Sequence, residues 1–465
     1  MATIDAEIAQ LANGSSGALG APNGLDVAPS CFTPAGTSRG GGRPGMSGTL
    51  YAPGTFPSSK PAAPPIYKTV NGGRRSQSII DLDIRIRAAS RSSELLQIIK
   101  EALHQFDTGN VVIAFACAAK LDDGQEMGTL AFSPAWRALQ DRLLACVDSL
   151  EPRGMSMVAY AAAKLMWGDS RLMLALARVG ARRAGDFGPT DIAKACWAFA
   201  KLRFVEEAAA TGFWQAMERE ARGASLRGRF VDLSMVTWAF ASTGYGTRSF
   251  FNEVAIEVGI ELDGLPPRSL AGMAWAFGKV GHRDDKLFAG IARRALAMSR
   301  EFGSHDVSAL CWGFTAVGFL DAELFGALAS SLCAAGLVRR ASPPLAAELA
   351  WAFAVARVSH GPLFAELRAL CADNVNTLET EDVVGFAWAF ATLGWPQECV
   401  ALAAITAYAA RFAGRFRPPE ARIVLWALAE AGRPSEALEA RLAQEAGLAQ
   451  EAVASKGDCE GGAQW

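Results

Sequence analysis

Residues 189–202 read PTDIAKACWAFAKL, and this stretch decides the fold because copies of its second half recur along the chain. The clearest copies begin at Trp197, Trp238, Trp275, Trp312, Trp351, Trp388 and Trp426, and weaker ones begin at Tyr160 (YAAAKL) and Ala116 (ACAAKL). Neighbouring copies lie 37 to 44 residues apart, most often 37. A period of this size is the signature of stacked helical hairpins.

Each copy divides into two helices. Around Trp275, a Pro-Pro turn leads into a first helix over 268–280, Gly281 ends it, and a second helix is expected over 284–299. The same glycine recurs six residues after the tryptophan, at Gly244, Gly318, Gly394 and Gly432. Six residues before it the side chain is often acidic or helix-capping, at Asp191, Asp232, Ser269, Asp306, Asp382 and Glu420. These signals predict an all-α fold, a right-handed α-solenoid of about nine helix-turn-helix repeats with a period near 37 residues.

The ends of the chain differ in composition from this repetitive part. Residues 1–73 are rich in Gly, Pro and Ser without apolar periodicity, so we expect disorder there. Residues 74–451 are expected to form the solenoid, and 452–465 a polar tail. Asp5 and Glu7 come early and the first arginine is Arg39, so the start of the chain shows no clear transit peptide.

Composition and motifs argue against several classes of protein. Hydrophobic residues make up 51% of the chain, yet no run reaches the roughly 18 apolar residues that a membrane helix needs, so we expect no membrane insertion. The nine cysteines lack zinc or redox spacing, which favours small buried apolar residues in a reducing compartment. No phosphate-binding loop, metal-ligand pair or nucleophile elbow occurs. We therefore expect no catalytic activity, no metal and no cofactor.

Three columns of the repeat predict its core. Counted from the tryptophan as zero, positions −5, −2 and +2 are apolar and lie on one helix face, as in Ile192, Val236 and Phe240. The tryptophan itself could pack between repeats or offer a stacking platform to RNA bases. Its alanine neighbours favour packing.

Four other columns vary between copies and predict an open ligand-binding face. They are −7, −4, −3 and +4. Column +4 carries lysine in four of its first five copies, which suits a phosphate backbone; the alternative is that each lysine complements a helix C-terminus. The candidate RNA-binding residues in these columns are Lys120, Lys164, Lys194, Lys201, Ser234, Arg268, Lys279, His305 and Ser308.

Charge is distributed unevenly along the chain. Residues 68–300 contain 31 Lys and Arg against 25 Asp and Glu, whereas residues 301–465 contain 11 against 19. A polyanion would therefore meet the first half of the stack more favourably, and a protein partner the second half.

The repeats resemble a known group of organellar proteins. The period, the motifs WAFAKL and WALAEAG, a second helix such as DDKLFAGIARRA, and the leading segment IRIRAASRSSELLQIIKEAL (84–103) are similar to octotricopeptide and heptatricopeptide repeat proteins and to FAST-kinase-like proteins. That resemblance implies action on mitochondrial or plastid RNA, in processing, stability, translation or editing complexes, or as part of a mitochondrial ribosome. Many of these proteins end in a RAP domain; residues 455–464 show no strand-like segment, so we expect none here.

These observations predict an organellar RNA-binding adaptor that holds single-stranded RNA along the first-helix face. The resemblance implies a mitochondrial location, with a plastid as the alternative. Two other functions stay open. One is a protein-binding scaffold or ribosome assembly component, and the weaker one is an enzyme with a site between repeats.

Overall fold

The computed structural model describes residues 76–121, 133–223, 229–260, 262–394 and 399–444. All regular secondary structure in these ranges is helical, so the predicted all-α solenoid fold is confirmed. The predicted disordered segment 1–73 and the polar tail 452–465 lie outside the described residues. None of the described helices is both long and apolar enough to cross a bilayer.

The helices alternate along the chain between a first and a second member of each hairpin. The first helices are α2 (Gln77–Ala88), α4 (Thr108–Leu121), α7 (Pro152–Lys164), α9 (Pro189–Lys201), α12 (Phe230–Thr243), α14 (Pro267–Lys279), α16 (Ser304–Ala316), α18 (Pro343–Val355), α20 (Thr380–Leu393) and α22 (Pro418–Glu430). The second helices are α3 (Ser92–Ala102), α6 (Pro134–Cys146), α8 (Ser170–Arg182), α11 (Phe213–Arg222), α13 (Arg248–Ile260), α15 (Asp285–Ala297), α17 (Ala322–Ala334), α19 (Gly361–Asn374) and α21 (Val400–Phe412).

Short helical turns connect these elements. The helix α10 (Glu206–Ala209) precedes α11. Single 3₁₀ turns follow most second helices, namely η1 (Leu103–Gln105), η2 (Val147–Ser149), η3 (Ala184–Asp186), η5 (Leu262–Gly264), η6 (Ser299–Glu301), η7 (Val375–Thr377) and η8 (Ala413–Arg415).

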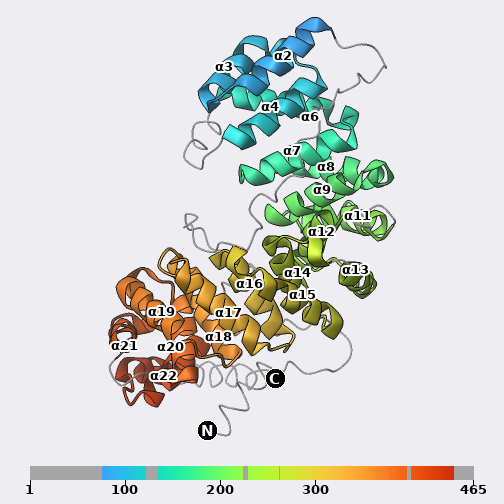
Figure 1. Cartoon of the computed structure of the whole chain (residues 1–465). Coiled ribbons are helices and arrows are strands. Elements are labelled where there is room, and N and C mark those ends of the chain that lie inside the picture. The colour runs from blue at the N-terminus through green and yellow to red at the C-terminus, as the bar shows by residue number, and fades with distance from the viewer. Residues whose placement is uncertain (1–75, 122–132, 224–228, 261, 395–398, 445–465) are drawn as a thin grey trace, which may run out of the picture. The chain divides into compact units, whose positions relative to one another are not determined.

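The chain divides into two compact units. Residues 53–291 belong to one, here called the first unit, and residues 292–465 to the other, the second unit. Within the first unit, α4, α7, α9, α12 and α14 pack side by side in one layer while the second helices form another (Figure 1). The second unit repeats this arrangement with α16, α18, α20 and α22. In both units the first helices contact one another more extensively than the second helices do.

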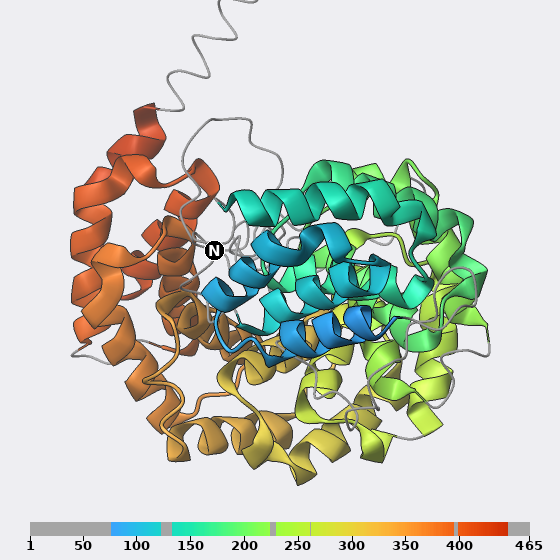
Figure 2. The ribbon, with the colours of Figure 1, turned by 90° about the horizontal axis from the view of Figure 1, so that it is seen from above.

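The first unit begins with a hairpin that carries no tryptophan motif. Helix α2 packs on α4 and α3 packs on α6, just as later hairpins pack on their successors (Figure 2). Leu82, Ile86, Leu95 and Ile99 are buried in this contact. The residues before the first motif therefore form a complete hairpin of the same architecture, in addition to the nine predicted copies.

The predicted core columns are buried. Every phenylalanine at +2 is at most 2% exposed, and the apolar residues at −5 and −2 are buried with them. The alanine at +1 allows close approach between first helices, which explains their extensive contacts. Cys196, Cys311 and Cys371 are buried and unpaired, in accord with their expected role as small apolar residues.

The acidic residue at −6 does not cap its own helix in α9 and α12, contrary to the prediction, although Glu420 of α22 does accept a hydrogen bond from the backbone N–H of its N-cap residue Arg417 at 2.8 Å. In α9 and α12 this residue occupies the third helical position, because the helix begins earlier, and no side chain caps either helix. Instead Asp191 accepts a hydrogen bond from Ser156 of the preceding first helix at 2.7 Å, and Asp232 accepts one from Thr190 at 3.0 Å. In these two helices the −6 residue joins neighbouring repeats.

The turn six residues after position zero is left-handed in both units, whether or not glycine occupies it. Gly281 and Gly432 have φ values of 64° and 69°, as their sequence position predicts. Arg357 adopts 57° at the equivalent position, and Met166 and Arg203 behave likewise. A side chain in this conformation stores strain of about 1 kcal/mol or more.

We expect Arg357→Gly to raise the free energy of unfolding by about 0.5 to 1 kcal/mol, because glycine adopts this conformation without strain. Gly432→Ala is the matched control and should lower it by a similar amount, since a Cβ there meets no neighbouring atom and only the backbone is strained. Urea unfolding curves measure both. If Arg357→Gly instead lowered the free energy of unfolding, the contacts of the arginine side chain would contribute more stability than its left-handed backbone conformation removes.

Candidate nucleic-acid interface

The solvent-facing side of the first helices is formed by columns −7, −3, 0 and +4, here called the first-helix face. Offsets of four, three and four residues place these columns on one side of a helix. In α9 they are Thr190, Lys194, Trp197 and Lys201, and the rest of that helix is buried apart from its first residue and Asp191. Trp197 itself is buried, but the equivalent residues Tyr160 and Trp275 are half-buried, so position zero borders this face.

The predicted column −4 does not belong to it. Ser234 is 1% exposed and donates to the carbonyl oxygen of Val231 at 2.9 Å. Ser308 is 3% exposed and donates to the Glu348 carboxylate of the next first helix at 2.8 Å. Both hydroxyls are satisfied inside the stack, so neither lies where a ligand could reach it. The prediction of an open column −4 was wrong.

The other candidate residues lie at the surface of first helices. Lys120 and His305 are exposed, whereas Lys164, Lys194, Lys201, Arg268 and Lys279 are half-buried. All except His305 lie in the first unit. The structure therefore brings six of the nine candidates onto the first-helix face of one compact unit.

The first-helix face of the first unit carries a single sign of charge. Its columns in α4, α7, α9, α12 and α14 hold seven basic side chains and no acidic one. Six are the predicted candidates, and the seventh is Arg153 at −7 of α7, which is exposed. The neighbouring acids Asp191 and Asp232 are engaged by Ser156, Thr190 and Arg229. A linear polyanion along this face would meet cations in nearly every repeat.

The lysines of this face have no acidic partner within the described part of the chain. Arginines elsewhere in the first unit do pair, as in Arg182–Asp148 at 2.7 Å and Arg222–Glu253 at 2.6 Å. Burial lowers the pKa of Lys164, Lys201 and Lys279 from the usual lysine value, and the charge of Arg203 adds to the effect at Lys201. These ammonium groups have lost part of their hydration and have no acidic partner to offset that cost. A bound anion would supply the missing favourable interaction.

Aromatic rings lie beside these lysines and pack on one another across repeats. The rings of Tyr160 and Trp197 are 5.0 Å apart, and those of Trp238 and Trp275 are 6.1 Å apart. Trp197 and Trp238 are only 4% and 2% exposed, so packing between repeats, the favoured interpretation, is their main role. Tyr160 and Trp275 are half-buried and keep part of their surface on the face. The Lys164 ammonium lies 6.0 Å from the centre of the Tyr160 ring.

The indole N–H groups of Trp197 and Trp238 are buried without a hydrogen-bond partner among the described residues. Such groups are uncommon, because each forfeits the hydrogen bond it made to water. Trp197 lies on α9 with Lys194 and Lys201, and Trp238 lies on the next first helix, α12. The donors that this face presents to a ligand are therefore its ammonium groups, because both indole N–H groups are buried.

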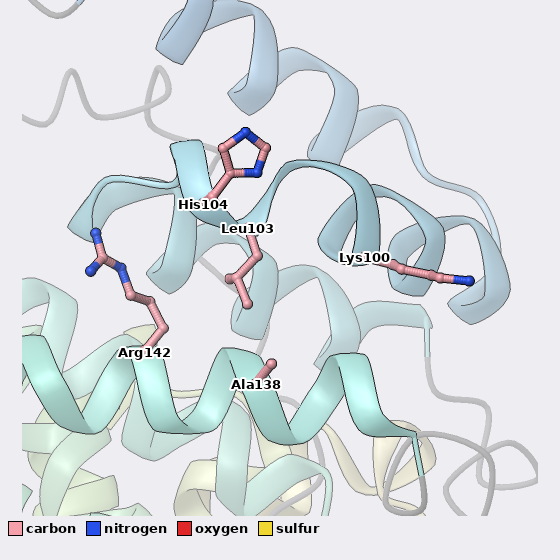
Figure 3. A pocket seen from close by; sticks show the side chains of 5 residues that line it. All are labelled: Lys100, Leu103, His104, Ala138 and Arg142. Atoms are coloured by element: carbon pink, nitrogen blue, oxygen red, sulfur yellow. The ribbon is translucent and has the colours of Figure 1, made fainter.

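A depression on the second-helix side of the first unit does not compete with this face. It is lined by Lys100, Leu103, His104, Ala138 and Arg142. Its three basic side chains point in different directions (Figure 3) and do not converge on one point. Arg142 also donates to the carbonyl oxygen of Phe106 at 3.2 Å. In the described ranges, no group of three or more His, Cys, Asp or Glu could hold a metal ion.

Comparison with known proteins places the chain in a family. No curated protein matches the sequence significantly. The sequence profile of the RNA-editing substrate-binding complex 6 protein family matches residues 112–433, which is more than half of the chain and spans all nine predicted copies of the repeat. The match agrees with the expected class, a helical-repeat protein associated with RNA, and names a different family from the octotricopeptide and FAST-kinase-like groups. The chain belongs to the RNA-editing substrate-binding complex 6 protein family.

Proposed function

We propose that this protein is a non-catalytic RNA-binding adaptor that holds single-stranded RNA along the first-helix face of its first unit. The observation that carries the proposal is the set of seven basic and no acidic side chains on that face, with the lysines unpaired within the described chain. The ammonium groups contact phosphates, and the half-buried rings of Tyr160 and Trp275 contact bases. The family name adds a context, an RNA-editing complex that binds its substrate.

Single-stranded RNA fits this face better than a duplex. The basic residues follow the stack one repeat at a time, with aromatic rings between them. An unpaired strand can place its phosphates on the lysines and turn its bases toward the rings, whereas a duplex hides its bases and presents only backbone.

The proposed compartment is a mitochondrion, with a plastid as the alternative, and the partners include other proteins of an RNA-processing complex. The support is the likeness of the repeats to organellar proteins. A fluorescent fusion of the full chain, imaged in its native cell with mitochondrial and plastid markers, tests the compartment. A purely cytosolic signal would contradict it.

Changing Lys164, Lys201 and Lys279 together to alanine should weaken RNA binding and make it less sensitive to salt. Filter binding of a single-stranded oligonucleotide to the full chain, across a salt series, measures this. The slope of log affinity against log salt should fall by about 2, at roughly 0.7 for each phosphate that a lysine no longer neutralises.

A matched variant separates the face from net charge. Lys100, Arg178 and Lys286 are exposed basic residues on the second helices α3, α8 and α15, and none has an acidic partner within the described chain. Changing these three to alanine removes the same charge and should leave the slope close to wild type. If the salt slope fell equally in both triple variants, binding would depend on total charge rather than on this face. If the slope were unchanged in the Lys164, Lys201 and Lys279 variant, these lysines would not contact the RNA.

A further inference from the structure

The first unit begins with a helix whose outer side is apolar and uncovered in the described chain. Helices α4, α7, α9 and α12 each pack between two other first helices, whereas α2 packs on α4 alone in that layer, at one end of the stack (Figure 1). Nine residues of α4 are buried but only two of α2, Leu82 and Ile86. Ile80 and Ile84 of α2 are 40% and 60% exposed, and no other described helix carries two such large exposed apolar residues.

These two isoleucines point away from the stack. At 100° for each residue, Ile84 lies about 160° around the helix from both Leu82 and Ile86, and Ile80 lies four residues earlier on the side of Ile84. The terminal repeat of a soluble solenoid normally has a polar outer face, because no further repeat covers it. The apolar outer side of α2 therefore indicates that another segment covers this end of the stack.

The chain directly before α2 contains an apolar segment of suitable size. Residues 66–70 read IYKTV, and three of these five side chains are large and apolar. The first and last of them, Ile66 and Val70, are four residues apart, so they share one side of the segment whether it is extended or helical. Residues 71–73 read Asn-Gly-Gly, which favours a tight reversal of the chain before α2 begins.

We propose that residues 66–70 fold back on the outer side of α2, where Ile66 and Val70 cover the two isoleucines and cap this end of the stack. The six residues that connect this segment to α2 span up to about 20 Å, whereas Ile84 lies only about 10 Å along the axis from the start of the helix, so the segment reaches both isoleucines. Because the segment and α2 belong to one chain, their effective concentration is on the order of millimolar, which favours this segment over a second molecule.

Hydrogen exchange of the purified full chain, without RNA, tests the proposal. In the double variant Ile66→Asp with Val70→Asp, the amides of α2 should exchange about tenfold faster or more, because burial of one aliphatic side chain is worth a factor of at least that size. The amides of α12 should not change. The matched control is Leu25→Asp with Val27→Asp, which removes two apolar residues farther from α2 and should leave its exchange within about twofold of wild type.

Trypsin cleavage after Lys68 tests the same contact from the other side. Ile84→Asp should raise the rate of this cleavage by about tenfold or more, because a carboxylate disfavours the apolar contact that shields the segment. Ile256→Asp is the matched control, since that side chain is 70% exposed on α13 of the same unit, and it should leave the rate unchanged. Cleavage after Arg39 provides an internal reference in every variant.

Three results would overturn the proposal. The first is wild-type exchange of the α2 amides in the Ile66 and Val70 variant, because residues 66–70 would then not cover this helix. The second is an equal rate of cleavage after Lys68 in Ile84→Asp and Ile256→Asp. The third is α2 protection that falls when wild-type protein is diluted about tenfold, because a second copy of the chain would then cover this end of the stack.

Discussion

Replacing Phe240 with alanine is expected to lower the free energy of unfolding of the first unit by about 3 to 5 kcal/mol. Phe240 is fully buried at +2 of α12. Its ring meets Phe250 edge-on at 4.9 Å and Trp214 at 6.2 Å. Gly246 packs closely against this side chain, since an added Cβ there would lie 2.9 Å from the Phe240 Cβ. Truncation therefore leaves a cavity lined by aromatic rings.

Urea unfolding followed by circular dichroism measures this loss, and hydrogen exchange locates it. In a stack each repeat contacts only its neighbours, so the amides of α9, α12 and α14 should lose protection before those of α2 and α4. Ile256→Ala is the control, because that side chain is 70% exposed on α13 of the same unit and its removal should cost less than about 0.5 kcal/mol. Similar losses in both variants would mean that the +2 column does not hold the repeats together.

The core and the period could be predicted from the sequence because they repeat. Phe240 and Phe277 both occupy column +2 and both are buried. Because the same apolar column appears in each copy, every copy supports the assignment of that column to the core. The hairpin of α2 and α3 has no tryptophan, and the sequence indicated it only as a leading segment over 84–103. Arg357 was missed as a left-handed turn for a similar reason, because no glycine marks it.

The binding face was only partly predictable, because helical periodicity does not say which side of a helix its neighbours cover. Columns −4 and −3 are 100° apart around the helix, and the polar character of Ser234 and Ser308 favoured exposure. Their hydroxyl groups are instead used inside the stack. Packing was the favoured interpretation of position zero, with base stacking as the alternative, and Trp275 is half-buried and keeps part of its surface exposed. Arg153 was missed because its copy of the motif is degenerate, but the −7 column could have identified it.

Glu348→Gln is expected to make the protein more stable above pH 8 and its stability less dependent on pH. The carboxyl group of an unfolded glutamate titrates near 4.5, whereas burial raises the pKa of folded Glu348 to about 8. Between these values the folded chain holds a proton that the unfolded chain has released. The free energy of unfolding therefore falls as pH rises from about 4.5 to about 8 and levels off above that range.

The glutamine side chain of the Glu348→Gln variant removes this pH dependence and keeps the hydrogen bond from Ser308. Glutamine still offers an oxygen to the Ser308 hydroxyl but cannot ionise, so the folded state no longer holds a charge that burial disfavours. After allowance for relaxation around a half-buried group, the gain at pH 9 should be about 2 to 4 kcal/mol, with little change at pH 5. Urea unfolding of both proteins at several pH values between 5 and 9 measures the difference.

Asp382 should account for part of the slope that remains in this variant. Burial, together with repulsion from Glu381, raises its pKa to about 7, so it also costs stability as pH rises. Glu323→Gln on α17 removes an exposed carboxylate and should shift the curve little at any pH. Parallel curves for wild type and Glu348→Gln would mean that Glu348 is ionised in the folded chain at neutral pH.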